Sequence, residues 1–194
     1  DLAEPEIKLA GLRFNPENSN SSRNLYFTSL TIQNVKNKSQ INIQDLPFPL
    51  KFQSYSFSPR ENYFSFIQVY KDHLSLWVIN LKTGKAKEIL NQGINSILGN
   101  SYSWAEDESF IICRSKGAKS RLSDTRDLPK GPIIQETTGE KLPARTFQDL
   151  LKNQQDEGRF DYYAACTLVK VYPEGELPTQ DFLGVAVYKS FSFS

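Results

Sequence analysis

A repeated stretch of sequence constrains the fold of this chain more than any other feature. Residues 53–90 contain four short apolar runs, separated by turn-forming residues, and the runs alternate in the way that β-strands do. When the sequence is shifted by 47 residues, Ser54–Phe66 aligns without a gap on Ser101–Cys113. The last residues, 190–194, begin a third copy. The chain is therefore expected to consist of repeating four-stranded units.

The size of this unit indicates a fold class. Four strands in a period of roughly 40 to 50 residues are typical of the blades of a β-propeller. The strands of the first unit are expected at residues 54–59, 63–69, 74–80 and 86–90. The third strand carries apolar residues on both faces, as in a sheet packed between two neighbours. The sequence predicts an all-β fold, a partial β-propeller of about two to three four-stranded antiparallel blades with one short helix in an insertion.

The repeat divides residues 1–194 into segments of a single propeller domain. Residues 1–23 are expected to form a strap, and residues 24–46 a half blade with strands at 25–32 and 41–43. The further segments are a blade at 50–90, a blade at 100–183 with an insertion at 115–159, and the first strand of the next blade at 184–194. At least about four blades are needed to close a ring. The chain is therefore expected to be the N-terminal part of a larger propeller protein.

The second blade is interrupted by the insertion. Ser101 and Ser190 are 89 residues apart, which is 42 more than the first period. The first part of the insertion is rich in Lys, Arg, Ser, Gly and Pro and predicts a long surface excursion. The third and fourth strands of this blade are then expected at residues 160–171 and 179–182.

A helix is predicted in the second part of the insertion. Thr146 is placed to cap its first turn, and Gly158 to stop it. Phe147, Leu150 and Leu151 fall on one face. A helix of about 11 residues is marginal alone, so this one is expected to dock on the sheet through that face.

Composition limits the classes of partner. The chain has 39% hydrophobic residues, enough to bury a core, and a formal net charge of +1 from 23 basic and 22 acidic residues. This balance gives no reason to expect nucleic acid or an anionic membrane as a partner. No apolar run approaches the ~18 residues of a membrane span. Because the chain begins at Asp1 and has no methionine, a processed form or a piece of a longer polypeptide is expected.

Two cysteines bear on the compartment. Cys113 and Cys166 are too few for a disulfide framework and lack the paired spacing of a zinc site. Buried thiols are the preferred interpretation. The two residues fall on predicted neighbouring strands, so a disulfide stays open as the alternative. Localisation is undecided, with an extracytoplasmic (periplasmic or secreted) location favoured over a cytoplasmic one.

The sequence offers few candidates for catalysis. No G-x-S-x-G nucleophile motif is present, and the single histidine, His73, lies in a predicted turn without a nucleophile arranged to use it. Asp156-Glu157 and Glu106-Asp107-Glu108 are acidic groups that suit a cation or acid–base work, but they lack companions at metal-ligand spacing. We interpret all of these as solvated surface residues. No catalytic, cofactor-binding or metal-binding residue is predicted.

Two further groups are open to two interpretations. The basic residues before the helix suit a phosphate or an acidic peptide, but a soluble surface loop explains them equally well. They are Arg114, Lys116, Lys119, Arg121 and Arg126. Tyr162 and Tyr163 suit the core of a blade better than a ligand platform.

Several segments resemble a known family. Residues 5–13, 76–78 with 83–86, and 98–100 are similar to the N-terminal propeller of glutamyl endopeptidase-like members of the prolyl oligopeptidase family. The most specific similarity lies in the insertion, at residues 131–136, 143–152 and 160–163. The resemblance covers essentially the whole chain.

The resemblance implies a serine peptidase whose propeller caps an α/β-hydrolase domain. The catalytic serine, aspartate and histidine would lie downstream of Ser194, and the present region would gate the entry of peptide substrates. A preference for cleavage after glutamate is implied as well, and neither Arg145 nor another basic residue is assigned to a glutamate pocket. The 194-residue chain alone is expected to be catalytically inactive. The alternative is a non-enzymatic propeller that serves as a protein-binding module.

Overall fold

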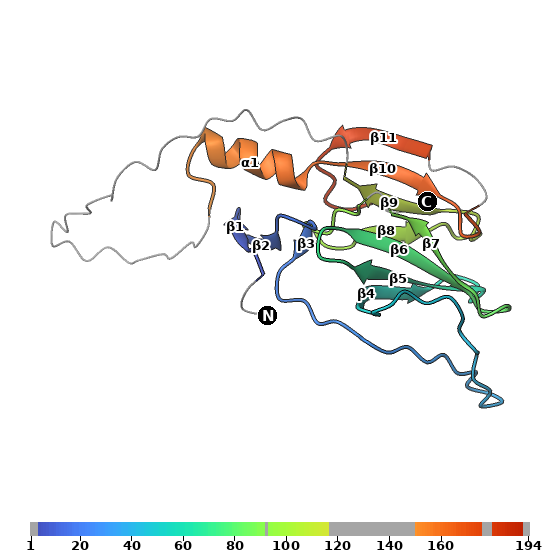
Figure 1. The fold of residues 1–194 in the computed structure, drawn as a ribbon. Helices are drawn as coiled ribbons and strands as arrows, with labels where there is room; N and C mark the ends of the chain where they lie inside the picture. Colours follow the sequence, from blue (N-terminus) through green and yellow to red (C-terminus); the bar gives the residue numbers. More distant parts are fainter. Residues whose placement is uncertain (1–3, 92, 117–149, 176–179, 192–194) are drawn as a thin grey trace.

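Two four-stranded antiparallel sheets form the main body of the protein. The computed structural model describes residues 4–91, 93–116, 150–175 and 180–191 (Figure 1). The first sheet contains β4 (Phe52–Phe57), β5 (Tyr63–Val69), β6 (Leu74–Asn80) and β7 (Ala86–Leu90). The second sheet contains β8 (Tyr102–Trp104), β9 (Ile111–Ser115), β10 (Cys166–Val171) and β11 (Gln180–Ala186). Each strand pairs with the next one, which confirms the repeating four-stranded unit and the all-β class.

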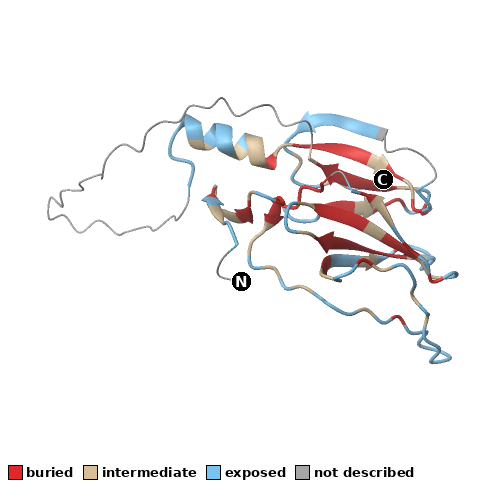
Figure 2. Cartoon of the chain, viewed as in Figure 1, coloured by how far each residue is buried: buried red, intermediate tan, exposed pale blue. Residues whose placement is uncertain are grey.

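The main core lies between these two sheets. Leu74, Leu76 and Val78 point from β6 toward the second sheet because alternate residues of a strand share a face. They meet Ile111 and Val169, and all of these side chains are buried. Burial of one such side chain stabilises the fold by about 1.5–3 kcal/mol. Figure 2 shows these strands as two neighbouring buried layers.

The opposite face of the first sheet is covered by residues 24–50. The predicted strands at 25–32 and 41–43 are wrong, because this segment makes isolated bridges such as Phe27 with Phe52 instead of a strand ladder. The alternating apolar residues of the segment, Leu30, Ile32, Ile41 and Ile43, instead pack on the sheet. One-sided burial therefore produced the strand-like pattern, although the main chain of this segment makes only isolated bridges.

The predicted N-terminal strap contains a small sheet. β1 (Ile7–Leu9), β2 (Leu12–Asn15) and β3 (Asn20–Ser21) pair in that order. Ala10 and Gly11 form the two-residue turn between β1 and β2, with φ of 53° and 74°. Such turns require positive φ at both positions, and Ala is an unusual choice for the first one. The prediction of a loop missed this hairpin for that reason.

The helix begins later than predicted. α1 spans Gln154–Ala164, and the side chain of Asn153 caps it by accepting a hydrogen bond of 2.9 Å from the Asp156 amide. Gly158 therefore lies inside the helix and does not end it. The predicted cap, Thr146, and Phe147 fall outside the described residues.

The third strand of the second sheet is correspondingly shorter than predicted. Residues 160–164 are helical, and β10 begins at Cys166. The aromatic run in this part of the sequence has a high β-propensity, and tertiary contacts override it. Leu150 and Leu151 precede the helix and are 49% and 38% exposed, so they do not dock it.

The helix docks on the small N-terminal sheet. The rings of Phe14 and Tyr163 lie 5.1 Å apart, within a cluster that includes Leu9 and Ile97. The side-chain amide of Asn95 donates hydrogen bonds of 2.8 and 3.2 Å to the carbonyl oxygens of Tyr163 and Ala165. These contacts hold α1 beside β1 and β2, as Figure 1 shows.

The ends of the second sheet match the repeat in part. The predicted fourth strand is confirmed and is longer, since β11 continues to Ala186. Residues 187–191 form no strand, and residues 192–194 lie outside the described part, so the start of a third copy stays a prediction.

Cys113 and Cys166 are both buried free thiols, and burial raises the pKa of each. The preference for thiols over a disulfide is confirmed.

Replacement of Phe14 tests the docking of the helix. Phe14→Ala removes a ring that is 1% exposed, and we expect it to lower the stability by about 3–5 kcal/mol. Leu150→Asp is the control, and it should leave the melting temperature unchanged because Leu150 is half exposed. Thermal unfolding followed by circular dichroism measures both. A large loss of stability in Leu150→Asp would contradict this account.

Two glycines form a matched pair. Gly84 has φ of +74°, and a Cβ there would lie 2.2 Å from the carbonyl oxygen of Asn42. Gly84→Ala should therefore lower the stability by at least about 1–2 kcal/mol, the cost of a left-handed conformation. Gly158→Ala, in an open helical position, should be neutral or stabilising by up to about 1 kcal/mol. Equal denaturation midpoints for the two variants would show that the turn is not constrained.

Candidate functional site

A polar groove lies where the first strands of the two sheets come together. Its volume is about 590 Å³, and its walls come from β4, β8 and the segments at 21–25 and 96–100. The lining side chains are mostly Ser, Asn and Gln, with Tyr55, Tyr102 and Trp104 as the aromatic members. No charged residue lines it within the described part of the chain.

One wall of the groove is fixed by a network of amides. The side chain of Gln53 donates a hydrogen bond of 2.7 Å to Asn20 Oδ1, and its own Oε1 accepts from Asn24 at 3.2 Å. Asn20 and Gln53 are buried, and buried amides are stable only when they are paired in this way. The wall is thus held in one arrangement, and its neutral donors and acceptors suit a peptide backbone better than a charged ligand.

The groove has the groups for binding but not for acid–base catalysis. Its serines would need a neighbouring base to become nucleophiles. No His, Asp, Glu or Lys of the described residues lines the groove to provide one. The chemistry of the groove is therefore that of a hydrogen-bonding surface.

Beside the groove, three polar side chains join the two sheets. The hydroxyl of Tyr102 donates to the carbonyl oxygen of Ser54 at 2.9 Å and accepts from the hydroxyl of Ser65 at 3.0 Å. The indole N–H of Trp104 donates to Ser65 Oγ at 2.9 Å. Burial raises the pKa of Tyr102, so the phenol keeps its proton. The aromatic side chains of β8 thus cover the first sheet with their polar atoms satisfied.

A buried carboxylate makes a second joint between the sheets. Glu108 lies in the turn between β8 and β9 and is 7% exposed. Its Oε1 accepts from the amide of Arg60 at 2.5 Å, and its Oε2 accepts from the side chain of Asn62 at 2.7 Å. Burial raises the pKa of Glu108, but hydrogen bonds from Ser58, Asn62 and Arg60 outweigh it and the pKa is lowered. The carboxylate is therefore held in its charged form against the turn between β4 and β5 of the first sheet.

A third joint lies at the same end of the sheets. Glu174, in the turn between β10 and β11, accepts hydrogen bonds from the hydroxyl of Tyr63 at 2.7 Å and from Asn80 at 3.1 Å. The hydrogen bond to this carboxylate raises the pKa of Tyr63 to about 12. The Lys87 ammonium donates to the carbonyl oxygen of Glu174 at 2.6 Å. Both turns of the second sheet thus hold the first sheet at one end.

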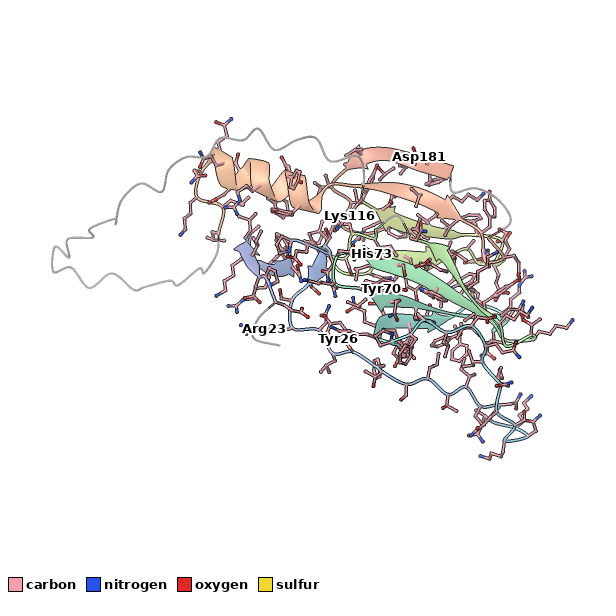
Figure 3. The ribbon with its side chains drawn as sticks, in the orientation of Figure 1. Arg23, Tyr26, Tyr70, His73, Lys116 and Asp181 are labelled. Carbon is pink, nitrogen blue, oxygen red and sulfur yellow. The ribbon has the colours of Figure 1, made fainter. Side chains whose placement is uncertain are left out.

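The single histidine lies at the other end of the sheets. His73 Nδ1 is 2.8 Å from a carboxylate oxygen of Asp72, and its ring stacks on Tyr70 at 4.5 Å (Figure 3). The hydrogen bond with His73 lowers the pKa of Asp72, whose side chain is exposed. A histidine next to an acid supplies two of the three members of a triad, and no serine or cysteine in the described part is hydrogen-bonded to this histidine. His73 acts as a turn residue here.

Two of the other acidic candidates, Asp156 and Asp107, have structural roles. Asp156 accepts from the amide of Lys152 and supports the start of α1. Asp107 accepts from the amide and the hydroxyl of Ser109 within its own turn. Among the residues that the structure describes, no group of three metal-ligating side chains is brought together.

Two of the basic candidates, Arg114 and Lys116, lie in the described residues and make different contacts. Arg114 is buried in β9, where its guanidinium donates to the carbonyl oxygen of Lys189 and lies over the ring of Phe191. Burial lowers its pKa. Lys116 donates to the carbonyl oxygen of Glu17 at 3.0 Å, at the end that carries His73 (Figure 3). Lys119, Arg121, Arg126 and Arg145 lie outside the described residues.

Sequence reasoning missed the residues that join the sheets. Glu108 was interpreted as a solvated residue, and it is buried. A signal was available, because Tyr102, Trp104 and Glu108 all lie within or beside the copy of residues 54–66 and therefore at equivalent positions of adjacent sheets. Tyr163 packs against Phe14, so it belongs to a core, although to that of the small N-terminal sheet.

No helix of the described residues is long and apolar enough to cross a membrane.

Comparison with known proteins relates this architecture to one class of enzyme. The chain is 30% identical over 204 aligned residues to a probable chloroplastic glutamyl endopeptidase of Arabidopsis thaliana, which covers 98% of this chain and 21% of that protein. It is similar to glutamyl endopeptidases. The corresponding protein of Oryza sativa subsp. japonica is 29% identical over 183 residues, covering 87% of this chain and 19% of that protein. The resemblance found in the sequence is thereby confirmed.

The matches cover most of this chain but only a small part of each relative. The chain spans about a fifth of the length of the curated relatives it matches. No family model matches this chain, and no solved structure matches it.

The Glu108 joint predicts a dependence of stability on pH. Because its pKa in the folded state is below the ordinary value of 4.5, its contribution is fully present above that value and is lost as the pH falls through the lowered pKa. We expect Glu108→Gln to lower the stability by about 1–3 kcal/mol at neutral pH. The variant should also show a flatter loss of stability between about pH 5 and pH 3.

Glu106→Gln is the matched control. Glu106 lies in the same turn and is exposed, so the control should reproduce the parent protein at every pH. Urea denaturation at a series of pH values measures the differences. Parallel curves for the parent and for Glu108→Gln would show that this carboxylate is not the acid-sensitive group.

Proposed function

We propose that this chain is the substrate-gating propeller region of a serine peptidase of the prolyl oligopeptidase family. The parent enzyme would hydrolyse peptide bonds of oligopeptides, with a preference for cleavage after glutamate. The observation that carries the proposal is the similarity to two proteins named glutamyl endopeptidase over 87–98% of this chain. The chain itself would contribute binding and exclusion, and not the chemical step.

The geometry supports a binding role. The described part of the chain offers a neutral groove of about 590 Å³ at the first strands of the two sheets. In a propeller the first strands of the blades surround the central channel. Backbone donors and acceptors of an extended peptide match the Ser, Asn and Gln side chains of the groove. A peptide that passes through the channel would therefore meet neutral hydrogen-bonding groups, which do not require the peptide to carry a particular charge.

The catalytic groups would come from another part of the polypeptide. The only acid–histidine pair of the described chain, Asp72 and His73, has no nucleophile hydrogen-bonded to it. The relatives are about five times as long as this chain, which leaves room for an α/β-hydrolase domain downstream of Ser194. That domain is the proposed partner of this region.

Peptide hydrolysis by two proteins tests the proposal. The complete gene product and the 194-residue chain are each incubated with internally quenched peptides that differ only in Glu, Gln or Ala at the central position. We expect the complete product to cleave the Glu peptide fastest and the 194-residue chain to cleave none. Loss of the activity on replacement of the serine in a downstream G-x-S-x-G motif would identify the nucleophile.

Two results would contradict the proposal. Cleavage by the purified 194-residue chain would place the catalytic groups within it. A complete gene product without such a serine and without peptidase activity would leave the alternative function, a propeller that binds proteins.

A further inference from the structure

Three side chains on one face of the first sheet are exposed although their copies in the second sheet are buried. Tyr55 and Phe57 of β4 are 53% and 50% exposed. Their equivalents 47 residues later, Tyr102 and Trp104, are 4% and 8% exposed. Glu61 is exposed, whereas its equivalent, Glu108, is 7% exposed. We call Tyr55, Phe57 and Glu61 the uncovered triplet.

The two copies have the same local structure. The amide of Ser58 donates to the carbonyl oxygen of Tyr63 at 2.9 Å, and Ala105 donates to Phe110 in the same way at 3.0 Å. Glu61 and Glu108 both adopt a left-handed backbone, with φ of 57° and 64°. A left-handed conformation is costly for residues other than glycine, so its recurrence shows that the two turns share this backbone conformation at the carboxylate residue. The difference in burial therefore comes from what lies opposite.

The structure shows what covers the second copy. The hairpin of β4 and β5 lies against it. The Ser54 carbonyl oxygen of this hairpin accepts a hydrogen bond from the Tyr102 hydroxyl, and Ser65 Oγ accepts one from the Trp104 indole N–H. The turn of this hairpin donates to Glu108 through the Arg60 amide and the Asn62 side chain. A hairpin of the same kind would satisfy the uncovered triplet.

The place for such a hairpin is open in the described chain. Residues 24–50 cover the same face of the first sheet, where their apolar residues pack on Phe52 at the start of β4 and on residues of β5, β6 and β7 such as Phe66 and Ile79. Phe27 reaches Tyr55, with ring centroids 5.4 Å apart, and Tyr55 is still 53% exposed. Tyr55, Phe57 and Glu61 thus stay exposed beside the part of this face that residues 24–50 cover.

We propose that the uncovered triplet is the docking site for a β-hairpin contributed by residues of the same polypeptide outside positions 1–194. This hairpin would place a carbonyl oxygen or a hydroxyl against Tyr55, an apolar or small residue against Phe57, and a turn with N–H donors against Glu61. The great length of the relatives supports a source outside this chain. The proposal rests on the internal repeat and holds whether or not the protein is a peptidase.

A second copy of the chain is a poor occupant for electrostatic reasons. Its β4–β5 hairpin is already occupied by its own Glu108. Its other hairpin, β8–β9, carries Asp107 where the observed occupant has Arg60, and so would bring a carboxylate next to Glu61. Ser109, which replaces Asn62 there, already donates its hydroxyl to Asp107. Like charges at an interface oppose association, so the site favours a hairpin of different sequence.

Hydroxyl-radical footprinting of the complete gene product tests the proposal. Tyr55 and Tyr102 have the same intrinsic reactivity, so their oxidation rates compare the two copies directly. We expect equal, low rates in the complete product at every protein concentration. In the 194-residue chain, Tyr55 should react several-fold faster than Tyr102, in line with exposures of 53% and 4%.

Substitution separates the site from general stability. In the complete product, Glu61→Gln should lower the melting temperature by several degrees and raise the oxidation rate of Tyr55, since a hydrogen bond to a charged group is lost. Glu106→Gln, an exposed neighbour of the equivalent turn, is the control and should change neither. In the 194-residue chain, Glu61→Gln should have no effect on the melting temperature.

Several results would overturn the docking site. Rapid oxidation of Tyr55 in the complete product would show that nothing covers it. Protection of Tyr55 in the 194-residue chain would assign the cover to its own residues, or to a second copy if the protection rises with concentration. A gene product that ends at Ser194 would remove the proposed source. None of these readouts depends on peptidase activity, so the docking site and the proposed function can fail separately.

Discussion

The contact between the two sheets is the interaction on which the rest of the structure depends. The first sheet buries apolar residues on both faces, and removal of apolar surface from water is the main favourable contribution to folding. The buried aliphatic residues of β6, β9 and β10 supply the bulk of the stabilisation. The polar joints at Tyr102, Trp104 and Glu108 supply orientation, because a hydrogen bond forms in only one register of the two sheets. The apolar side chains that stabilise the contact and the hydrogen bonds that orient the two sheets thus lie in the same interface.

The two ends of the sheets have different tasks. The turns at one end hold the carboxylates of Glu108 and Glu174, which both bind the first sheet. The connections at the other end include the turn with His73, the small N-terminal sheet and α1. The long insertion also leaves the second sheet at that end, between β9 and β10. Each doubling of the length of a flexible loop adds only about 0.6 kcal/mol to the entropy of closing it, so a long connection costs little there.

The repeat explains why part of the fold was predictable. Four strands in each unit follow from apolar alternation and turn residues, and their positions agree with β4 to β7 within two residues. Alternation alone does not distinguish a paired strand from a segment that lies on a sheet, so residues 24–50 were misassigned. The helix was displaced because Asn153, and no residue before it in the described part, provides the cap. Its aromatic residues face a partner that is distant in sequence, which local patterns do not reveal.

The candidate site was harder to predict than the fold, for a physical reason. A carboxylate in a turn is exposed by default, and only a neighbouring sheet makes Glu108 a buried acceptor. The same residue type at the same turn, Glu61, shows the default state within the same molecule. The role of each copy is therefore set by its neighbour and not by its own sequence. The contact between the two sheets is therefore directional, since Glu108 and Glu174 of the second sheet both accept hydrogen bonds from the first sheet, whereas Glu61 of the first sheet is exposed. At the far side of the second sheet, the edge strand β11 exposes Phe182 and Val185, so the two outer sides of the pair of sheets are unlike.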